Sequence, residues 1–278
     1  MVSIIITTFK NKQNLKNALI TVTNQTYDNL EIIVVDGANL QTNENVVRQF
    51  GTKIKYLEVE KEVVNWAGHK AIQHQRNIGC KKAKGEWIAM LDDDDEWDKD
   101  KIKKQVEHIH KDVSLITCWT ITYTEDKEFY DRPERIIQYK DLLKNFNLSN
   151  TSSYFIRKKT LEEIGWWDEE IKGMHEYDIA LKIAKKGYGI ISVYKYLLIR
   201  HRNYEEQLGG IQWKIAEQLQ FWRRYGFDVI KYLSLTELVI KVVNSIGLVI
   251  VYFLGFIFKN RIWNVLYPIK EMYEGKKC

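Results

Sequence analysis

The sequence predicts an α/β protein built on a parallel, doubly wound sheet. Short β-branched runs alternate with segments of helical spacing four times within residues 1–97. Such alternation favours parallel strands joined by helices. The composition agrees, because 45% of the 278 residues are hydrophobic and only two are proline, so a large core can form and wholesale disorder is not expected. In sheets of this kind, ligands bind at the carboxyl ends of the strands.

The first half supplies the regular part of this sheet. Buried strands are expected at Ser3–Thr8, Glu31–Asp36 and Lys53–Val59, and in the apolar run from Trp87 that ends at the aspartates. Helices are expected at Asn14–Thr23, at Val46–Phe50 and from about Lys70 to Lys84. Apolar residues recur there at the spacing of one helix face.

The second half is less regular. The pattern indicates strands at 114–122, 151–157, 190–193 and 196–200, and helices at 139–147, 176–186 and from about residue 205 to the end. The helix at 176–186 ends at Gly187, a residue typical of helix termini. We therefore expect a catalytic domain over 1–203, divided into halves 1–97 and 98–203, and a helical region over 204–278.

Four consecutive aspartates, Asp92–Asp95, end the fourth strand, and Glu96 and Trp97 follow. Side chains alternate along a strand, so Asp92 and Asp94 are expected to leave it on the same side. Carboxylate oxygens suit Mg²⁺ or Mn²⁺. A solvated acidic turn is the alternative interpretation. Thr7, Thr8 and Asp36 fall at the ends of the neighbouring strands, which favours a ligand site at this edge.

Six motifs follow one another along the chain, at Val2–Phe9, Ile32–Ala38, Gln75–Glu86, Leu91–Trp97, Ile164–Glu169 and His175–Leu181. In these motifs and in their order, the sequence resembles the family 2 glycosyltransferases over roughly residues 1–203. Members of that family are inverting enzymes of the GT-A fold, a mixed sheet flanked by helices, and they use nucleotide-sugar donors.

On the donor side, the resemblance implies a divalent ion, Mn²⁺ or Mg²⁺, that neutralises charge on the departing diphosphate. Asp94 is the first choice for direct ligation. Asp92 would bind directly, through water or to the ribose, Asp93 would point the other way, and Asp95 would orient a neighbour. His201 matches a position where the family often has a third ligand, although a structural histidine is equally compatible.

The remaining donor contacts are also implied by the resemblance. The expected donor-binding residues are Thr7, Thr8, Asp36, Arg76, Asp92 and Asp93. Asp36 would contact the base, with uracil favoured, and Arg76 would lie near the diphosphate or brace the aspartates.

On the acceptor side, the family usually reads Glu-Asp at the catalytic base, and this chain has His175-Glu176 instead. Glu176 therefore falls at the base position, and Asp178 is the alternative. Either carboxylate could also serve simply to favour the helix dipole. Trp166 and Trp167 are candidates for an apolar platform under an acceptor sugar ring, and burial in the core is the alternative for one of them.

The stretch 242–258 contains no charged residue and is flanked by Lys241, Lys259 and Arg261. Seventeen residues is the lower limit for a spanning helix. An interfacial or re-entrant helix is favoured over a single span or a buried oligomer helix, because basic residues on both sides argue against a clean span. A peripheral position at the cytoplasmic face of the membrane, or a short C-terminal anchor, is expected.

Charge and cysteines agree with that location. The formal net charge of +5 suits anionic small molecules or a membrane surface and does not call for nucleic acid. Three scattered cysteines, Cys80, Cys118 and Cys278, are expected to be reduced thiols. The start Met1-Val2-Ser3 predicts no secretory signal.

The sequence and the resemblance together predict a metal-dependent, inverting, hexosyltransferase-type enzyme that moves a sugar from a nucleotide donor, with UDP favoured. The acceptor is expected to be a saccharide, lipid-linked, in cell-surface polysaccharide or glycan synthesis, and a homo-oligomer is allowed. The alternatives are a polyprenyl-phosphate sugar synthase and a non-catalytic nucleotide- or cation-binding module.

Overall fold

The computed structural model describes residues 1–9, 11–38, 41–51, 53–59, 69–146, 148–171, 173–202 and 211–257, with backbone alone at 69–71, 211–215 and 248–257. The chain divides into two compact units. The first comprises residues 1–142 and 146–204, and the second comprises residues 143–145 and 205–278.

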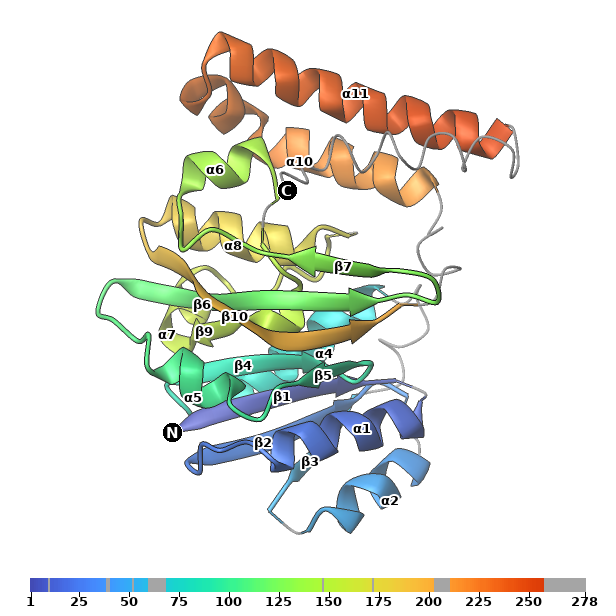
Figure 1. Cartoon of the computed structure of the whole chain (residues 1–278), viewed down its shortest axis with the longest axis vertical. Coiled ribbons are helices and arrows are strands. Elements are labelled where there is room, and N and C mark those ends of the chain that lie inside the picture. Colours follow the sequence, from blue (N-terminus) through green and yellow to red (C-terminus); the bar gives the residue numbers. More distant parts are fainter. Residues whose placement is uncertain are drawn as a thin grey trace. The chain divides into compact units, whose positions relative to one another are not determined.

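A ten-stranded mixed sheet forms the centre of the first unit (Figure 1). Its main order is β3-β2-β1-β4-β9-β6-β10-β5, and β7 and β8 pair with β6 and β10. The strands are β1 Val2–Thr8, β2 Leu30–Asp36, β3 Lys55–Glu58, β4 Trp87–Asp92, β5 Asp95–Trp97, β6 Val113–Tyr123, β7 Glu128–Asp131, β8 Ile136–Ile137, β9 Phe155–Arg157 and β10 Gly189–His201. The first four strands along the chain, β1 to β4, pair in parallel, as the alternation predicts.

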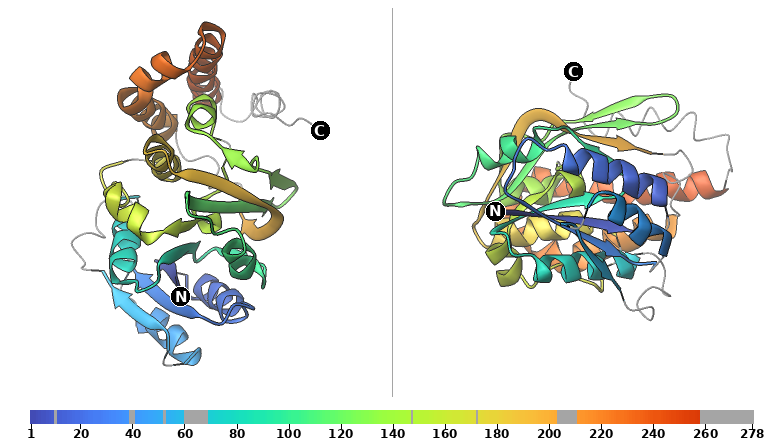
Figure 2. Two further views of the ribbon diagram at one scale, coloured as in Figure 1. Left: turned by 90° about the vertical axis from the view of Figure 1, so that its left-hand side faces the viewer. Right: turned by 90° about the horizontal axis from the view of Figure 1, so that it is seen from below.

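Helices cover both faces of this sheet (Figure 2). Those of the first unit are α1 Lys12–Thr23, α2 Gln41–Gln49, α4 His69–Lys82, α5 Lys101–Val106, α7 Lys158–Glu163 and α8 His175–Lys185. Helix α6, Tyr139–Lys144, begins in the first unit and ends in the second, and a 3₁₀ turn, η1, spans Thr151–Ser153.

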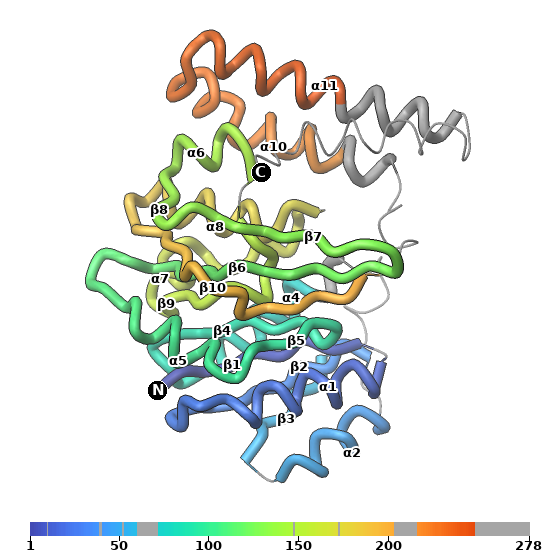
Figure 3. Tube along the Cα trace, in the orientation of Figure 1, coloured from blue at the N-terminus to red at the C-terminus, as the bar shows by residue number. Residues whose placement is uncertain are grey.

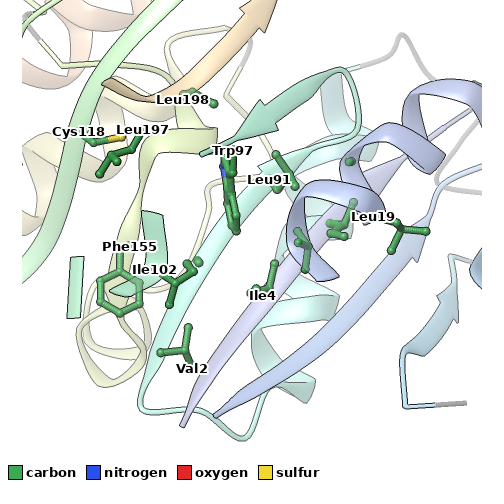
Figure 4. Packing of buried hydrophobic residues seen from close by; sticks show 14 of the residues in the cluster. Val2, Ile4, Leu19, Leu91, Trp97, Ile102, Cys118, Phe155, Leu197 and Leu198 are labelled. Atoms are coloured by element: carbon green, nitrogen blue, oxygen red, sulfur yellow. The ribbon is translucent and has the colours of Figure 1, made fainter. Parts of the chain in front are cut away.

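Successive side chains of β1 point to opposite faces of the sheet, and both faces are packed against helices or other core residues. Ile4 and Ile6 join a core cluster with Leu19 of α1 and with Trp97 (Figure 4). Ile5 faces α4, where a Cβ on Gly79 would lie 2.5 Å from its Cγ2. Glycine therefore lets α4 approach the sheet closely, and β1 is buried on both faces, as parallel central strands are.

The register then gathers polar residues at one edge. Thr7 of β1 pairs with Asp92 of β4, and Thr8 pairs with Asp36 of β2. All three strands run in the same direction, so their carboxyl ends meet there. The fold thus forms the edge at which the sequence places a ligand site.

The second half departs from the parallel pattern. Strand β9 is antiparallel to both β4 and β6 between which it lies. The predicted strand at 151–157 begins as η1, and the two pieces at 190–193 and 196–200 are one strand with shifts of register. Hydroxyls that bond to nearby backbone favour turns over a ladder, as Ser153 Oγ does in donating to the carbonyl of Asn150 at 2.7 Å.

The second unit contains two long helices, α10 Ile211–Tyr232 and α11 Leu235–Ile257, which lie side by side (Figure 3). Trp222 Nε1 donates to Ser245 Oγ at 3.2 Å, and the Lys241 ammonium lies 4.3 Å from the Phe221 ring centroid. None of the helices that the structure describes is both long and apolar enough to cross a membrane. The predicted helical segments at 205–210 and beyond 257 lie outside the described residues.

Candidate active site

Two threonine hydroxyls orient the first two aspartates of the acidic cluster. Thr7 Oγ1 donates to Asp92 Oδ1 at 2.9 Å, and Thr8 Oγ1 donates to Asp93 Oδ2 at 2.6 Å. The backbone N–H of Asp93 donates to the carbonyl of Thr7 at 3.2 Å. Consecutive residues of β1 thus bind consecutive aspartates, which places the two carboxylates on different sides of the chain.

The chain turns immediately after Asp92. Strand β4 ends there, Asp93 and Asp94 form a turn, and β5 begins at Asp95. The strand alternation used to relate Asp92 to Asp94 therefore stops at Asp92, and the turn sets their relation. Asp95 is buried, with its Oδ2 bonded by Asn150 Nδ2 at 2.9 Å and its Oδ1 3.5 Å from Arg200 Nε.

Asp94 differs from its neighbours. Its side chain is exposed, and within the described part of the chain its carboxylate accepts no hydrogen bond. Desolvation by the surrounding protein, and then the charges of Asp95, Asp92 and Asp93, raise its pKa. Desolvation also raises the pKa of Asp93 to about 6. A nearby cation would relieve this crowding, so the donor chemistry at Asp94 and Asp92 suits a hard divalent ion.

Arg76, fully buried on α4, braces the cluster. Its Nη2 donates to both carboxylate oxygens of Asp92, at 2.9 and 3.0 Å, and its guanidinium lies 4.8 Å from the Trp167 ring centroid. Its Nε and Nη1 are buried without a hydrogen-bond partner among the described residues. Of the two roles that the sequence left open for Arg76, bracing the aspartates is the one that these contacts support.

Asp36 lies at the end of β2 and is fully buried. It accepts from the Ala38 N–H at 2.8 Å, from Asn43 Nδ2 at 3.0 Å and from the Tyr56 hydroxyl at 2.7 Å. These donors come from three successive segments and hold the end of the strand. Contact of Asp36 with a nucleotide base stays a prediction.

The two carboxylates proposed for the catalytic base have different surroundings at the start of α8. The Glu176 side chain is 24% exposed, and its Oε1 lies 3.2 Å from His175 Nε2. Asp178 is only 1% exposed, and its Oδ2 lies 2.6 Å from Lys182 Nζ on the next turn. Greater solvent access, and the absence of a lysine partner among the described residues, favour Glu176 as the group that a substrate reaches.

The environment of Glu176 keeps it ionised. Burial raises its pKa, but the charge of His175, the hydrogen bond from His175 and the charge of Arg76 together outweigh burial, and the pKa of Glu176 is lowered. The Tyr154 hydroxyl donates to the Glu176 carbonyl at 3.2 Å and holds the backbone at this point. Glu176 is therefore a positioned carboxylate, and the guanidinium that holds Asp92 also acts on it through its charge.

His201 ends β10, with its Nε2 3.4 Å from Glu96 Oε1 and its ring stacked on Tyr123. This end of β10 lies beside β5, whose first residue, Asp95, pairs with Arg200. Within the described residues, however, no three His, Cys, Asp or Glu side chains gather closely enough to hold a metal ion between them. Ligation by His201 stays a prediction.

The adjacent tryptophans have separate neighbours. Trp167 is buried, with its backbone N–H and carbonyl bonded to the side-chain amide of Asn77. Trp166 is half-buried and lies below the Lys81 ammonium, 6.0 Å from its ring centroid. Trp167 thus packs against Arg76 inside the protein, and an acceptor platform stays a prediction.

Sequence reasoning missed residues that act through the backbone or through distant contacts. Ser152 Oγ accepts from the Asp92 N–H at 3.0 Å, and its carbonyl accepts from Trp97 Nε1 at 2.8 Å. The polar run Thr151-Ser152-Ser153 inside an expected strand was the available signal. Nothing in the sequence pattern singles out Asn150 as a partner of Asp95.

The sequence model of one family, described as Glycosyl transferase family 2, matches residues 3–165. A second, described as Glycosyl transferase family group 2, matches residues 87–269. The chain is similar to an uncharacterized glycosyltransferase of Rickettsia typhi, with 28% identity over 74% of this chain and 65% of that protein. It is also similar to the amylovoran biosynthesis glycosyltransferase AmsB of Erwinia amylovora, with 26% identity over 69% of this chain and 66% of that protein. The chain spans about two thirds of both relatives and 35% of another from Rickettsia felis.

Solved structures share the fold. TarS of S. aureus, in complex with UDP-GlcNAc, is similar over 94% of this chain and 76% of its own, with a TM-score of 0.65 and 14% identity. The mannosyltransferase PcManGT of Pyrobaculum calidifontis, in complex with GDP-Man and Mn²⁺, is similar over 99% of this chain and 81% of its own, with a TM-score of 0.61 and 15% identity. At these identities the likeness shows a GT-A fold.

Proposed function

The chain belongs to glycosyl transferase family 2, and we propose that it is a metal-dependent, inverting enzyme that moves a hexosyl group from a nucleotide-sugar donor to a saccharide acceptor. One observation carries the proposal. The buried guanidinium of Arg76 donates to Asp92, the proposed donor-side carboxylate, and its charge also lowers the pKa of Glu176, the proposed base. An acidic cluster and a separate ionised base are the two parts that inverting transfer requires.

On the donor side, Asp94 and Asp92 would hold Mn²⁺ or Mg²⁺, with His201 as a further ligand. When bound, the ion supplies positive charge against the diphosphate of the donor. Thr7 and Thr8 orient Asp92 and Asp93, Arg76 holds Asp92, and Asp36 is proposed to contact the base. UDP-sugars are favoured as donors, and the neighbours solved with UDP-GlcNAc and with GDP-Man make both nucleotides worth testing.

On the acceptor side, Glu176 is the proposed base. Its carboxylate takes the proton from the acceptor hydroxyl as that oxygen bonds to the anomeric carbon. The bond from the anomeric carbon to the leaving diphosphate breaks, and its electron pair stays with the diphosphate. Attack from the face opposite the leaving group inverts the configuration.

The acceptor is proposed to be a lipid-linked saccharide at a membrane surface, in polysaccharide biosynthesis, as the name of the AmsB relative suggests. Apolar side chains on α11, Leu235, Val239, Val243 and Ile246, are each more than half exposed. Their spacing places them along one side of the helix. An interfacial helix agrees with this surface.

The proposal is tested by incubating the protein with UDP- and GDP-linked hexoses, with Mn²⁺, with Mg²⁺ or with EDTA, and measuring nucleotide release. Release with at least one donor, lost in EDTA and restored by Mn²⁺, is expected. NMR of the product's anomeric carbon then reports inversion. Binding of a nucleotide sugar without turnover under every condition, with saccharide and polyprenyl-phosphate acceptors supplied, would instead indicate a binding module.

A further inference from the structure

His175 is a residue that the donor and base assignments leave unused, and it departs from the usual Glu-Asp pattern of the resemblance. We propose that His175 is a positioning residue for sugar transfer, which holds one carboxylate oxygen of Glu176 and sets through its own charge how strongly Glu176 takes the acceptor's proton. This inference rests on the proposed function, because it takes Glu176 as the base.

The geometry of the pair supports this role. His175 Nε2 lies 3.2 Å from Glu176 Oε1, and the side chains are 14% and 24% exposed. The His175 ring packs edge-on against the buried ring of Trp167, with centroids 6.4 Å apart. Met174, just before it, has a φ of 43°, in the left-handed region, which costs backbone energy that the surrounding fold must offset. In this proposal the contact with His175 fixes Glu176 Oε1, and Oε2 receives the proton of the acceptor hydroxyl.

The surroundings of Nδ1, the second ring nitrogen of His175, indicate that the charge of the imidazole can change. His175 Nδ1 is buried and has no hydrogen-bond partner within the described residues. An imidazolium would leave an N–H donor unsatisfied there, which costs about 1–3 kcal/mol. A neutral ring with its proton on Nε2 keeps the bond to Glu176 and leaves only an acceptor unpaired. The carboxylate of Glu176 favours the charged ring and the buried Nδ1 disfavours it, so neither form is fixed by the fold.

The charge of His175 changes Glu176 as a base. With His175 protonated, its charge lowers the pKa of Glu176 and makes it a weaker base. Loss of that proton as the pH rises strengthens Glu176. Among the described residues, the other charged or titratable groups that act on the pair are Arg76 from α4, Tyr154 from the segment before β9 and Arg202 beyond β10. The pKa of Tyr154 is raised far above neutrality, and histidine is the side-chain type in this set whose charge can change near neutral pH.

The pH dependence of kcat and KM tests the inference, with Mn²⁺ and donor saturating. Between pH 5.5 and 8 we expect kcat of the native chain to rise about 3- to 10-fold through the range of imidazole ionisation. His175→Gln keeps a hydrogen-bond donor but cannot titrate, so this step should vanish while KM stays unchanged. His175→Phe removes the donor as well and should lower kcat about tenfold at pH 8.

His74→Gln is the matched control, because His74 Nδ1 lies 3.0 Å from Glu169 Oε2 in another His–Glu pair. The His74→Gln variant should keep the rise in kcat between pH 5.5 and 8. Retention of the imidazole step in His175→Gln would overturn the inference even if Glu176 is the base. A fully active Glu176→Gln would instead overturn the base assignment. In the Glu176→Gln background, His175→Phe should cause no further loss, since the two act as one unit.

A measurement independent of turnover is the NMR titration of the His175 ring proton in the full chain. The Glu176→Gln change removes the neighbouring negative charge and should lower the titration midpoint of His175 by about one pH unit. An unchanged midpoint would show that the two groups are not coupled, whether or not a sugar is transferred.

Discussion

Two acidic regions at one edge of the sheet are tuned in opposite directions. In the acidic turn, Asp92–Asp95, desolvation and like charges raise the pKa values of Asp93, Asp94 and Asp95. At the start of α8, the charge of His175 when protonated, its hydrogen bond and the charge of Arg76 outweigh burial and lower the pKa of Glu176. In the acidic turn, Arg76 and Arg200 do not offset burial and the like charges, whereas beside Glu176 the positive charge outweighs burial.

This difference in electrostatic environment fits the different functions proposed for the two regions. Crowded carboxylates carry a cost that a divalent ion relieves on binding, so the acidic turn is incomplete by itself. Glu176 is already compensated and stays ionised, as a base must before the acceptor arrives. Arg76 contacts the first region and acts electrostatically on the second, which makes it the link between them.

The largest expected effect comes from the α8 region. Glu176→Gln should lower kcat about 10³-fold, because the proton on the acceptor hydroxyl has no positioned base. Calorimetry should find donor binding nearly unchanged, since the donor side is intact. Asp178→Asn is the comparison, and a larger loss in that variant would move the base to Asp178.

In the acidic turn, Asp94→Ala should reduce metal-dependent turnover about 10²-fold, because the most open carboxylate of the cluster is lost. Thermal melts with and without Mn²⁺ check the cause. The native chain should gain stability from Mn²⁺, and the variant should gain little. Full activity of the variant would remove Asp94 from the proposed ligands.

Arg76→Met tests the link between the regions. It leaves Asp92 without its buried partner and should lower the free energy of unfolding by about 3 kcal/mol, measured in urea. Arg48→Met is the control, because Arg48 is 71% exposed in its pair with Glu44, and such a pair contributes about 0.5 kcal/mol or less. Equal losses in the two variants would contradict a bracing role for Arg76.

The smallest effect is a contrast in stability with pH, measured in EDTA. The pKa of Asp93 in the folded state is raised to about 6, so on lowering the pH the folded state binds a proton before the unfolded state does. Protonation of Asp93 should therefore raise the free energy of unfolding by up to about 1 kcal/mol as the pH falls from 7 to 5. Asp93→Asn should reduce that rise. The folded pKa of Glu176 is lowered, so the stabilisation from this carboxylate persists down to about pH 4.5 and adds no slope of its own between pH 7 and 5. Equal slopes in the native chain and in Asp93→Asn would contradict the raised pKa of Asp93.

Much of the fold followed from local pattern. The β-branched runs at Ser3–Thr8 and Glu31–Asp36 predict buried parallel strands, and both form. The pattern failed at residues 151–157, where a 3₁₀ turn precedes a short antiparallel strand, because apolar periodicity does not record which strand a segment will pair with.

The sequence by itself determined the α/β alternation, the order of the motifs and the identity of the charged residues, because periodicity and residue type are local properties. Only the tertiary structure decided their partners. Thr7 meets Asp92 across 85 residues because of the register between β1 and β4, and the turn at Asp93-Asp94 replaces the strand geometry expected there. Whether a carboxylate is crowded or compensated depends on neighbours brought from distant segments, and this contrast between Asp94 and Glu176 is what the fold adds to the sequence.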